Sequence, residues 1–294
     1  MSTNDTIDPG VAGHQSNSFK YILFRIEDGV ATITLNRPDQ MNAYNFALGA
    51  ELATAYAHCD ADDNVRAVIV TGAGKAFCAG ADMSRGDETF SGGRSNSSPG
   101  RKPARKGLHA FQVRKPVIAA INGHAVGIGL TLALQCDLRI VATDAKLAFP
   151  FVRRGITPEL GSSSILPRLI GFARAADLML SGRTIRGDEA AALGLASEAV
   201  AAEDVVARAR EWARDVAVNA APVAVALTKQ LLWEGTTAQP QDAMAKENRL
   251  LAWIGKQPDA IEGVRSFLER RTPEWKLKVS TDLEDPPTPV EQAT

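Results

Sequence analysis

The 294-residue sequence has few of the features that mark secreted, metal-binding or nucleic-acid-binding proteins. Its three cysteines, Cys59, Cys78 and Cys136, are an odd number without framework spacing, which indicates reduced thiols in a cytoplasmic protein. Lys and Arg number 33 against 34 Asp and Glu, so the net charge is −1 and there is no basic excess for nucleic acid. Residues 1–18 lack the cationic start and apolar run of a signal peptide and are expected to form a disordered leader.

The longest stretch without charge covers residues 116–136, whose 21 residues could cross a bilayer by length alone. Asn122-Gly123-His124 interrupts the stretch, and Gly127 and Gly129 follow. In lipid, the polar groups of this segment would lack hydrogen-bond partners. We therefore interpret it as a buried strand, a glycine-rich turn and a buried helix, and expect no membrane span.

Motifs for several common chemistries are also missing. The four histidines show no ligand spacing, and neither HExxH nor CxxC occurs, so no metal site is expected. There is no GxSxG motif and no Walker phosphate loop. The run 127–132 follows a strand as a dinucleotide turn would, but its third glycine position is Leu132 and a short gap to Leu138 leaves no room for the usual crossover helix. Binding of a nicotinamide dinucleotide at this turn is therefore kept only as an alternative to the functions discussed below.

Hydrophobic periodicity predicts an α/β fold with an antiparallel start and a helical end. Asp28-Gly29 lies between two β-rich runs within 21–35 and predicts a hairpin. Residues 84–107 are rich in Ser, Gly and Arg, and are expected to form either a mobile lid or a solvated insertion. Further strands are expected at 65–70, 117–121 and 138–142, and helices at 45–59, 108–113, 129–135, 158–170, 173–180, 187–193, 203–219, 222–235, 242–254 and 259–268.

Two turns of small residues, each after an apolar strand, are the best candidates for a site. The first is Ala79-Gly80-Ala81-Asp82, and the second covers residues 123–129. Small residues let a ligand approach the main chain, and N–H groups at a helix start favour negative charge. If the turns converge, they form an oxyanion hole, which stabilises a developing negative oxygen by about 3 kcal/mol per donor. The alternative is two tight turns that need glycine for conformation alone.

Five stretches carry a family resemblance: Arg37-Pro38 with Met41-Asn42-Ala43, then 76–82, 115–123, 136–139 and 193–195. In this order, over residues 19–271, they resemble the crotonase superfamily, the enoyl-CoA hydratase/isomerase group. The resemblance implies a crotonase-like spiral of ββα units over 19–215, a helical C-terminal trimerisation region over 216–271 and an extended tail over 272–294. It also implies an acyl-CoA thioester as ligand, no cofactor other than the coenzyme A of the substrate, and a homotrimer or a hexamer of two trimers.

The resemblance further implies that two backbone N–H groups, those of Ala81 and Ile128, hold the thioester oxygen. The second position is usually glycine in this family, but only its amide is needed. Isoleucine should therefore reduce the room for the acyl group and keep the hydrogen bond. For Asp82, capping of the helix after the turn is favoured over a role on the substrate. The residues expected along the substrate are Met41, Ala43, Ala79, Asp82, Gly127, Thr131, Phe151 and Pro158.

Carboxylates distinguish the possible reactions. Family hydratases use two glutamates to hold and split a water, and the matching positions are Thr131 and Phe151, which are neither acids nor bases at neutral pH. Residues 155–163 are instead similar to the segment of peroxisomal-type Δ3,Δ2-enoyl-CoA isomerases that bears a single catalytic glutamate, which falls on Glu159. The resemblance implies that Glu159 moves a proton from C2 to C4 while the oxyanion hole holds a dienolate. The alternative is that Glu159 only caps or charges the start of the following helix.

Three functions follow from this reading of the sequence. The leading one is the isomerisation of 3-enoyl-CoA to 2-enoyl-CoA. The second is hydration or another crotonase-type reaction that uses the same oxyanion hole. The third is a non-catalytic acyl-CoA-binding protein that keeps the fold without turnover.

Overall fold

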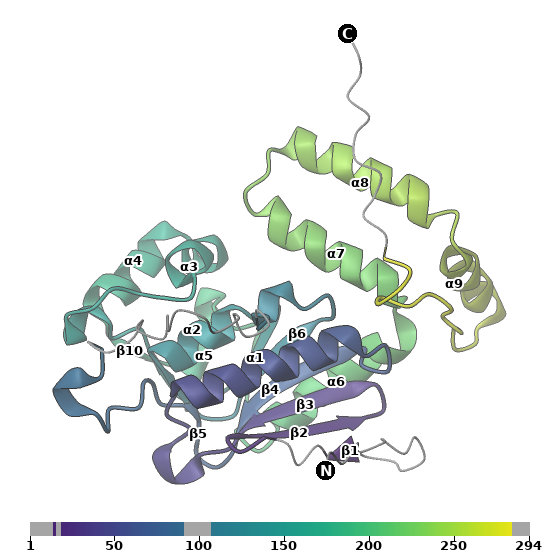
Figure 1. Ribbon diagram of the computed structural model, residues 1–294. Coiled ribbons are helices and arrows are strands. Elements are labelled where there is room, and N and C mark those ends of the chain that lie inside the picture. Colours follow the sequence, from purple (N-terminus) through teal and green to yellow (C-terminus); the bar gives the residue numbers. More distant parts are fainter. Residues whose placement is uncertain (1–13, 16–18, 91–106, 284–294) are drawn as a thin grey trace, which may run out of the picture.

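Two β-sheets, with the chain passing repeatedly from one to the other, form the centre of the molecule (Figure 1). The computed structural model describes residues 14–15, 19–90 and 107–283, so most of the expected leader, the centre of the 84–107 segment and the end of the tail lie outside the described residues. The larger sheet has the strand order β1-β2-β3-β4-β6-β8-β11, and the smaller one β10-β9-β7-β5. The strands are β1 (His14–Gln15), β2 (Ile22–Glu27), β3 (Val30–Leu35), β4 (Ala67–Gly72), β5 (Ala76–Cys78), β6 (Val117–Ile121), β7 (His124–Val126), β8 (Leu138–Ala142), β9 (Lys146–Ala148), β10 (Thr184–Arg186) and β11 (Glu198–Val200).

The chain enters the larger sheet through the predicted hairpin. Strands β2 and β3 pair antiparallel, with Glu27 opposite Val30. The two loop residues, Asp28 and Gly29, have φ values of 52° and 77°. Positive φ at both positions is the requirement of a type I′ turn, which Asp-Gly satisfies at low cost. The hairpin prediction is therefore confirmed.

From β4 onward, each turn of the chain gives one strand to each sheet. Strand β4 is followed by β5, β6 by β7, and β8 by β9. The first members pair parallel in the larger sheet, and the second members pair parallel in the smaller one. This repetition is the spiral of ββα units that the resemblance implies. The strands expected at 117–121 and 138–142 are confirmed, and the one expected at 65–70 begins and ends two residues later.

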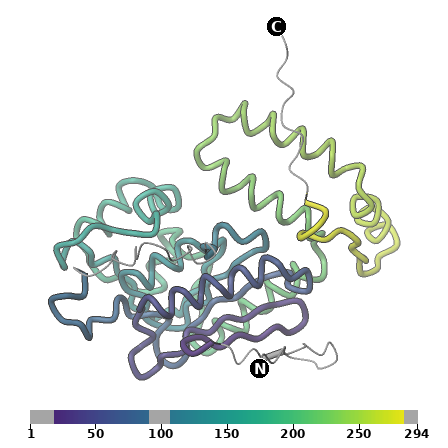
Figure 2. The backbone as a smooth tube through the Cα atoms, in the orientation of Figure 1, coloured from purple at the N-terminus to yellow at the C-terminus, as the bar shows by residue number. Residues whose placement is uncertain are grey.

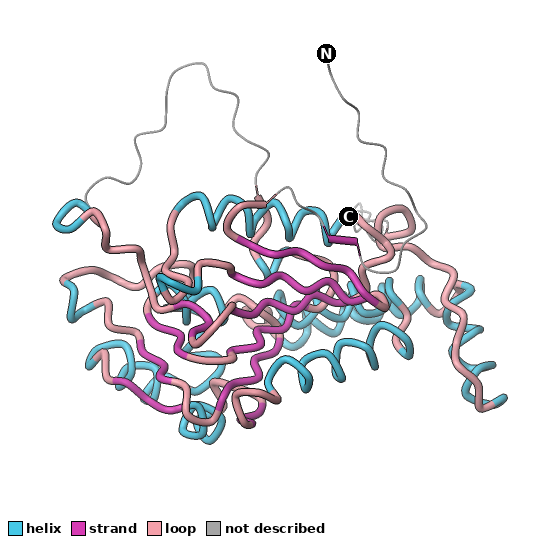
Figure 3. The backbone as a smooth tube through the Cα atoms, turned by 90° about the horizontal axis from the view of Figure 1, so that it is seen from below, coloured by secondary structure: helices cyan, strands magenta, loops and turns pink. Residues whose placement is uncertain are grey.

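Helices cover the sheets on both sides, as the view in Figure 3 shows. The predicted start of the first helix is confirmed, because the Asn45 side chain accepts a hydrogen bond from the N–H of Leu48. The segment expected to be helical at 108–113 contains only the short 3-10 helix η3 (Ala110–Gln112). The helices are α1 (Phe46–Ala61), α2 (Ile128–Leu134), α3 (Ser162–Ile170), α4 (Phe172–Ser181), α5 (Gly187–Leu193), α6 (Val205–Asn219), α7 (Pro222–Gly235), α8 (Pro240–Ile254) and α9 (Pro258–Glu269).

The expected helix at 158–170 begins four residues late, at Ser162. Leu160 and Gly161 have φ values of 55° and 76°, and these left-handed residues separate Pro158 and Glu159 from the helix. The sequence pattern did not reveal the break because proline followed by an acidic residue is a common helix start. Glu159 is consequently placed on a turn.

The apolar side chains form two cores. The first fills the space around the sheets, where every residue of β4 and β6 is buried. The second lies among α7, α8 and the segment after α9. Figures 1 and 2 show that α7 and α8 stand apart from the sheets. Within the described ranges, no single helix is long and apolar enough to cross a membrane. Helices α6 and α7 reach the necessary length and apolar composition only when taken together, and the chain bends by 120° between them.

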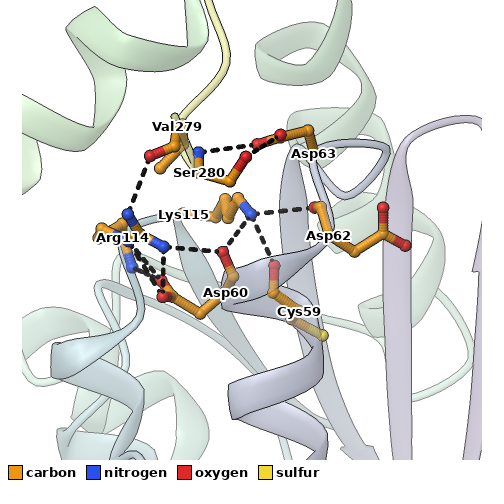
Figure 4. Close-up of polar contacts among 8 residues, drawn as sticks. All are labelled: Cys59, Asp60, Asp62, Asp63, Arg114, Lys115, Val279 and Ser280. Atoms are coloured by element: carbon orange, nitrogen blue, oxygen red, sulfur yellow. Dashed lines mark hydrogen bonds and ion pairs between the residues drawn. The ribbon is translucent and has the colours of Figure 1, made fainter. Parts of the chain in front are cut away.

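Polar contacts join the segment after α9, residues 272–283, to the sheet region (Figure 4). The Arg114 guanidinium pairs with Asp60 at 2.8 Å and donates to the Val279 carbonyl at 2.9 Å. Ser280 also contacts Asp63 through its N–H at 3.0 Å. The neighbouring Lys115 ammonium donates to three carbonyl groups at the end of α1, where carbonyls lack partners within the helix. The residues after α9 therefore contact Arg114, which precedes β6, and Asp63, which follows α1.

Candidate active site

The two small-residue turns meet, as the sequence predicts. Strands β5 and β7 pair parallel, with Cys78 opposite Ala125. The following residues stay in contact, because a Cβ on Gly129 would lie 2.1 Å from the Cys78 carbonyl oxygen. A Cβ on Gly80 would likewise lie 3.3 Å from the Val126 carbonyl oxygen. Glycine is required at position 129 because no side chain fits between α2 and β5.

Each turn presents a backbone N–H group that is available to a ligand. Tyr44 and Ala81 form a parallel bridge, in which the Tyr44 N–H donates to Gly80 at 2.7 Å and the Asp82 N–H donates to Tyr44 at 2.8 Å. This pattern leaves the Ala81 N–H without a partner among the described residues. Ile128 is the first residue of α2, so its N–H has no partner within the helix. Both predicted oxyanion donors are therefore in adjoining turns and unused.

A loop between β3 and α1 supports the first turn. Met41 and Asn42 have φ values of 50° and 55°, a left-handed conformation that asparagine tolerates better than most residues. The buried Asn42 side chain holds the loop by donating to Ala73 at 2.9 Å and to Ala76 at 2.8 Å. The Ala79 N–H donates to Met41 at 3.0 Å. The predicted contact residue Met41 thus lies directly beside Ala79.

An ion pair fixes the same loop to the turn that carries Ala81, at residues 79–82. The Arg37 guanidinium pairs with Asp82 at 2.6 Å and also donates to the Ala43 carbonyl. The hydrogen bond from Arg37, followed by those from Ser84, lowers the pKa of Asp82 to about 2. The cap interpretation of Asp82 is wrong, because the next helical turn begins only at Gly86 and its N-cap is Arg85. The carboxylate is occupied by Arg37 and Ser84, so Asp82 shapes the turn.

Neither position that matches the hydratase glutamates offers an ionisable group. Thr131 is fully buried in α2, and its hydroxyl donates to the Ile128 carbonyl at 3.0 Å. Phe151 is 5% exposed and belongs to the core around the sheets. Gly127, the N-cap of α2, has a φ of 54° and donates its N–H to Ala148 at 2.9 Å. Thr131 and Gly127 thus belong to the first turn of α2, which carries the Ile128 amide, and Phe151 belongs to the core.

Glu159 is presented by the left-handed turn before α3, next to the half-buried Pro158. The residue is exposed as a whole, but its carboxyl group has enough neighbouring atoms for partial burial to raise its pKa. Its side chain does not cap α3, whose N-cap is Gly161. The capping form of the helix-start alternative is therefore excluded, whereas a charge effect on the start of α3 at Ser162 stays an alternative. A carboxyl with a raised pKa suits a group that must both accept and return a proton.

Tyr44 is a site residue that the sequence analysis missed. Its backbone pairs with the turn that carries Ala81, and its hydroxyl lies above Gly49, where an added Cβ would be 1.9 Å from the oxygen. Burial raises the pKa of the Tyr44 phenol, and the negative charges of Glu159 and Cys78 raise it further. The phenol therefore stays protonated at neutral pH. The available signal was its position directly after the Met41-Asn42-Ala43 motif.

Comparison with known proteins identifies the family. The profile described as Enoyl-CoA hydratase/isomerase matches residues 25–278. The chain belongs to this family. It is thus an acyl-CoA enzyme of the enoyl-CoA hydratase/isomerase family with the crotonase fold. Within the ranges that the structure describes, His, Cys, Asp and Glu side chains form no group of three that could hold a metal ion.

The relatives of the chain carry both hydratase and isomerase names. An enoyl-CoA hydratase of Alternaria alternata, ACTT3, is 39% identical over 250 residues, which are 85% of this chain and 83% of that protein. The 1,2-epoxyphenylacetyl-CoA isomerase of Escherichia coli (strain K12) is 34% identical and covers 88% of this chain and 99% of that protein. The crystal structure of a probable enoyl-CoA hydratase/isomerase from Mycobacterium abscessus superposes with a TM-score of 0.81 at 40% identity, over 87% of this chain and 98% of that chain. The family is thereby established, and the reaction within it is a separate question.

Proposed function

We propose that this enzyme isomerises 3-enoyl-CoA to 2-enoyl-CoA, with Glu159 as its only acid–base carboxyl group. The observation that supports the proposal is the pair of buried, non-ionisable side chains, Thr131 and Phe151, at the positions of the two hydratase glutamates. A site with one carboxyl group suits a reaction in which one group takes and returns the same proton. Hydration by the two-glutamate route lacks its groups here.

The proposed reaction keeps atoms and charges balanced. The Glu159 carboxylate removes a proton from C2, and the electrons of that C–H bond form a dienolate whose charge rests on the thioester oxygen. The N–H groups of Ala81 and Ile128 stabilise this oxygen because they lie in adjoining turns and have no other partner among the described residues. Protonated Glu159 then returns the proton at C4, and the double bond moves into conjugation with the thioester.

The isomerase proposal is tested by Glu159→Gln, which keeps the shape of the side chain and removes its ability to take a proton. We expect kcat for trans-3-hexenoyl-CoA to fall by about 10²–10⁴-fold. The rate is followed by the absorbance of the conjugated thioester. A matched control is Glu211→Gln on α6, whose side chain is 75% exposed and pairs only with Arg208 among the described residues. Wild-type turnover in Glu159→Gln would show that another group is the base.

Hydration remains the second candidate because most of the named relatives are hydratases, including the 39% identical protein of Alternaria alternata. In that case Glu159 would activate a water without a second carboxylate. The test is the loss of conjugated-thioester absorbance when wild-type enzyme is mixed with crotonyl-CoA. Water addition faster than isomerisation would favour hydration, and binding of acyl-CoA without either reaction would favour a non-catalytic protein.

We also propose that the enzyme assembles as a homotrimer through its C-terminal helices. Large apolar side chains on α7–α9 are exposed in the single chain, which is typical of surfaces that pack against another subunit. Light scattering after size exclusion distinguishes one, three and six copies of the 31.3 kDa chain. The exposed residues are Leu232, Leu251, Ile261, Val264, Phe267 and Leu268.

A further inference from the structure

The turn that presents Glu159 has a strained backbone. Leu160 has a φ of 55°, in the left-handed region that branched and bulky residues rarely adopt. Such a conformation persists only where surrounding contacts hold it, and it is often found at functional sites. The question is therefore which contacts hold Leu160.

Two helices fix the turn from opposite sides. On the side of α3, the N–H and hydroxyl of Ser162 donate to the Glu159 carbonyl at 3.1 Å and 2.7 Å. On the side of α2, the Gln135 side-chain amide donates to the Leu160 carbonyl at 3.0 Å. Gln135 is the C-cap of α2 and only 3% exposed. Its contact with Leu160 is a partly buried link between segments 25 residues apart in sequence.

The same helix begins at the oxyanion hole. Ile128, the first residue of α2, carries an unused N–H, and Gly129 holds this end against Cys78. An α-helix rises 1.5 Å per residue, so Ile128 and Gln135 are separated by about 10 Å along its axis. Because a hydrogen-bonded helix is stiff, α2 sets the distance between the oxyanion donor and the turn of Glu159.

We propose that Gln135 is a positioning residue, which holds Leu160 in its left-handed conformation and thereby keeps the Glu159 carboxyl directed at the acyl group that the oxyanion hole holds. This inference rests on the proposed role of Glu159 and deepens it. Without the amide donor, Leu160 relaxes toward negative φ and Glu159 turns toward water. The Ala81 and Ile128 amides keep their places, because they lie on other segments of the chain.

The kinetic test is Gln135→Met, which keeps the length of the side chain and removes its donor. We expect kcat for trans-3-hexenoyl-CoA to fall about 10- to 100-fold, as for a misplaced catalytic group, with KM changed less than about threefold. The acid limb of the kcat profile should also move to lower pH, since a carboxyl released into water loses the burial that raises its pKa. A purely structural role would lower stability and leave that limb in place.

A matched control and a rescue variant sharpen the kinetic test. Ser266→Ala also removes a buried side-chain donor to a backbone carbonyl, that of Gly263, but on α9. We expect wild-type kcat and an unmoved acid limb from this control. Leu160→Gly should restore most of kcat when added to Gln135→Met, because glycine adopts positive φ without strain. Wild-type kcat in Gln135→Met, or no gain from Leu160→Gly, overturns the inference.

A measurement without turnover separates this inference from the proposed function. Amide hydrogen exchange over residues 156–162 should become faster in Gln135→Met, and return toward the wild-type rate when Leu160→Gly is added. It should be unchanged in Ser266→Ala. Unchanged exchange in Gln135→Met overturns the positioning role, whereas turnover retained in Glu159→Gln overturns the proposed function.

Discussion

At the scale of single residues, buried polar side chains fix the loops that build the site. Asn42 has no solvent exposure and makes three hydrogen bonds to backbone groups of three different segments. Arg37 connects the same loop to Asp82, and its guanidinium lies 5.7 Å from the centre of the Tyr21 ring. Such bonds contribute about 1–3 kcal/mol each when their loss would leave a buried group unpaired. The turn that carries Ala81 therefore depends on the side chains of Arg37 and Asn42, which lie on another segment.

Replacing Asp82 by asparagine tests this dependence. Asp82→Asn removes the charge that Arg37 pairs with, so we expect the free energy of unfolding at pH 7 to fall by about 1–2 kcal/mol. Arg37 holds the pKa of Asp82 down at about 2, so its contribution is complete above about pH 4. The contribution is lost as the pH falls toward 2, because the unfolded chain binds the proton first.

Urea unfolding of wild type and Asp82→Asn at pH 7 and pH 3 measures both effects. The difference between the two proteins should shrink at the lower pH. The exposed pair of Asp177 and Arg183 provides the control, since Asp177→Asn should change stability by less than about 1 kcal/mol. A pH-independent difference for Asp82→Asn would contradict the ion-pair explanation.

At the scale of elements, the site is formed by the close approach of β5 and α2. Gly129 makes this approach possible, since its nearest neighbour is the backbone carbonyl of Cys78, which cannot rotate away. Ala81 lies three residues after the end of β5, and Ile128 is the first residue of α2. A small increase in their separation therefore moves one oxyanion donor relative to the other.

Gly129→Ala should separate the two elements. The added Cβ would lie 2.1 Å from the Cys78 carbonyl oxygen, so α2 must shift. We expect kcat/KM to fall by at least about 100-fold, the effect of losing one oxyanion donor. Gly235→Ala is the control, because nothing lies within 4 Å of its added Cβ. Near-wild-type kcat/KM in Gly129→Ala would show that the contact is unimportant.

The long elements were predictable from sequence, and the short ones were not. Helix α1 was anticipated from Asn45 and the spacing of Leu48 and Leu52, and β6 from an unbroken apolar run. Strands β5, β7 and β9 have three residues each, too few for a periodic pattern, and their small residues resemble turns. Their pairing is decided by contacts between neighbouring turns of the spiral.

The candidate site was also predictable only where a local sequence pattern marks it. The turns that carry Ala81 and Ile128 were visible as small-residue segments after strands, and Glu159 entered through the family resemblance. Tyr44 and Gln135 could not be found in this way, because their relation to Glu159 depends on segments brought together only by folding. The left-handed Leu160 was hidden because leucine gives no local signal for positive φ.

At the scale of the whole molecule, the C-terminal helices have their own small core. Val223 and Leu227 of α7 and Leu250 of α8 pack with Val279, which follows the last helix. The Arg114 contacts with Asp60 and Val279 tie this core to the sheet region (Figure 4). These contacts of the extended segment add to those that α7 makes directly, where the Lys229 ammonium pairs with Asp137 at 2.7 Å.

Arg114→Ala should loosen that attachment. The variant removes a multiply bonded ion pair and the bond to Val279, so we expect proteolysis to cut within residues 272–283 faster than in wild type. Arg25→Ala serves as the control, because Arg25 pairs with Glu27 at the surface with 53% of its side chain exposed. Limited proteolysis with mass spectrometry locates the cuts, and equal cleavage rates for both variants would contradict the prediction.

Helix α2 has seven residues, and its length determines whether Gln135 reaches Leu160. One inserted residue would rotate the far end of the helix by about 100° and advance it by about 1.5 Å. The Gln135 amide would then point away from Leu160, although Ile128 would keep its place beside β5. A deletion would rotate the far end of α2 in the opposite direction and would also separate Gln135 from Leu160. Insertions and deletions within this helix should therefore lower kcat at least as much as Gln135→Met does in otherwise folded variants.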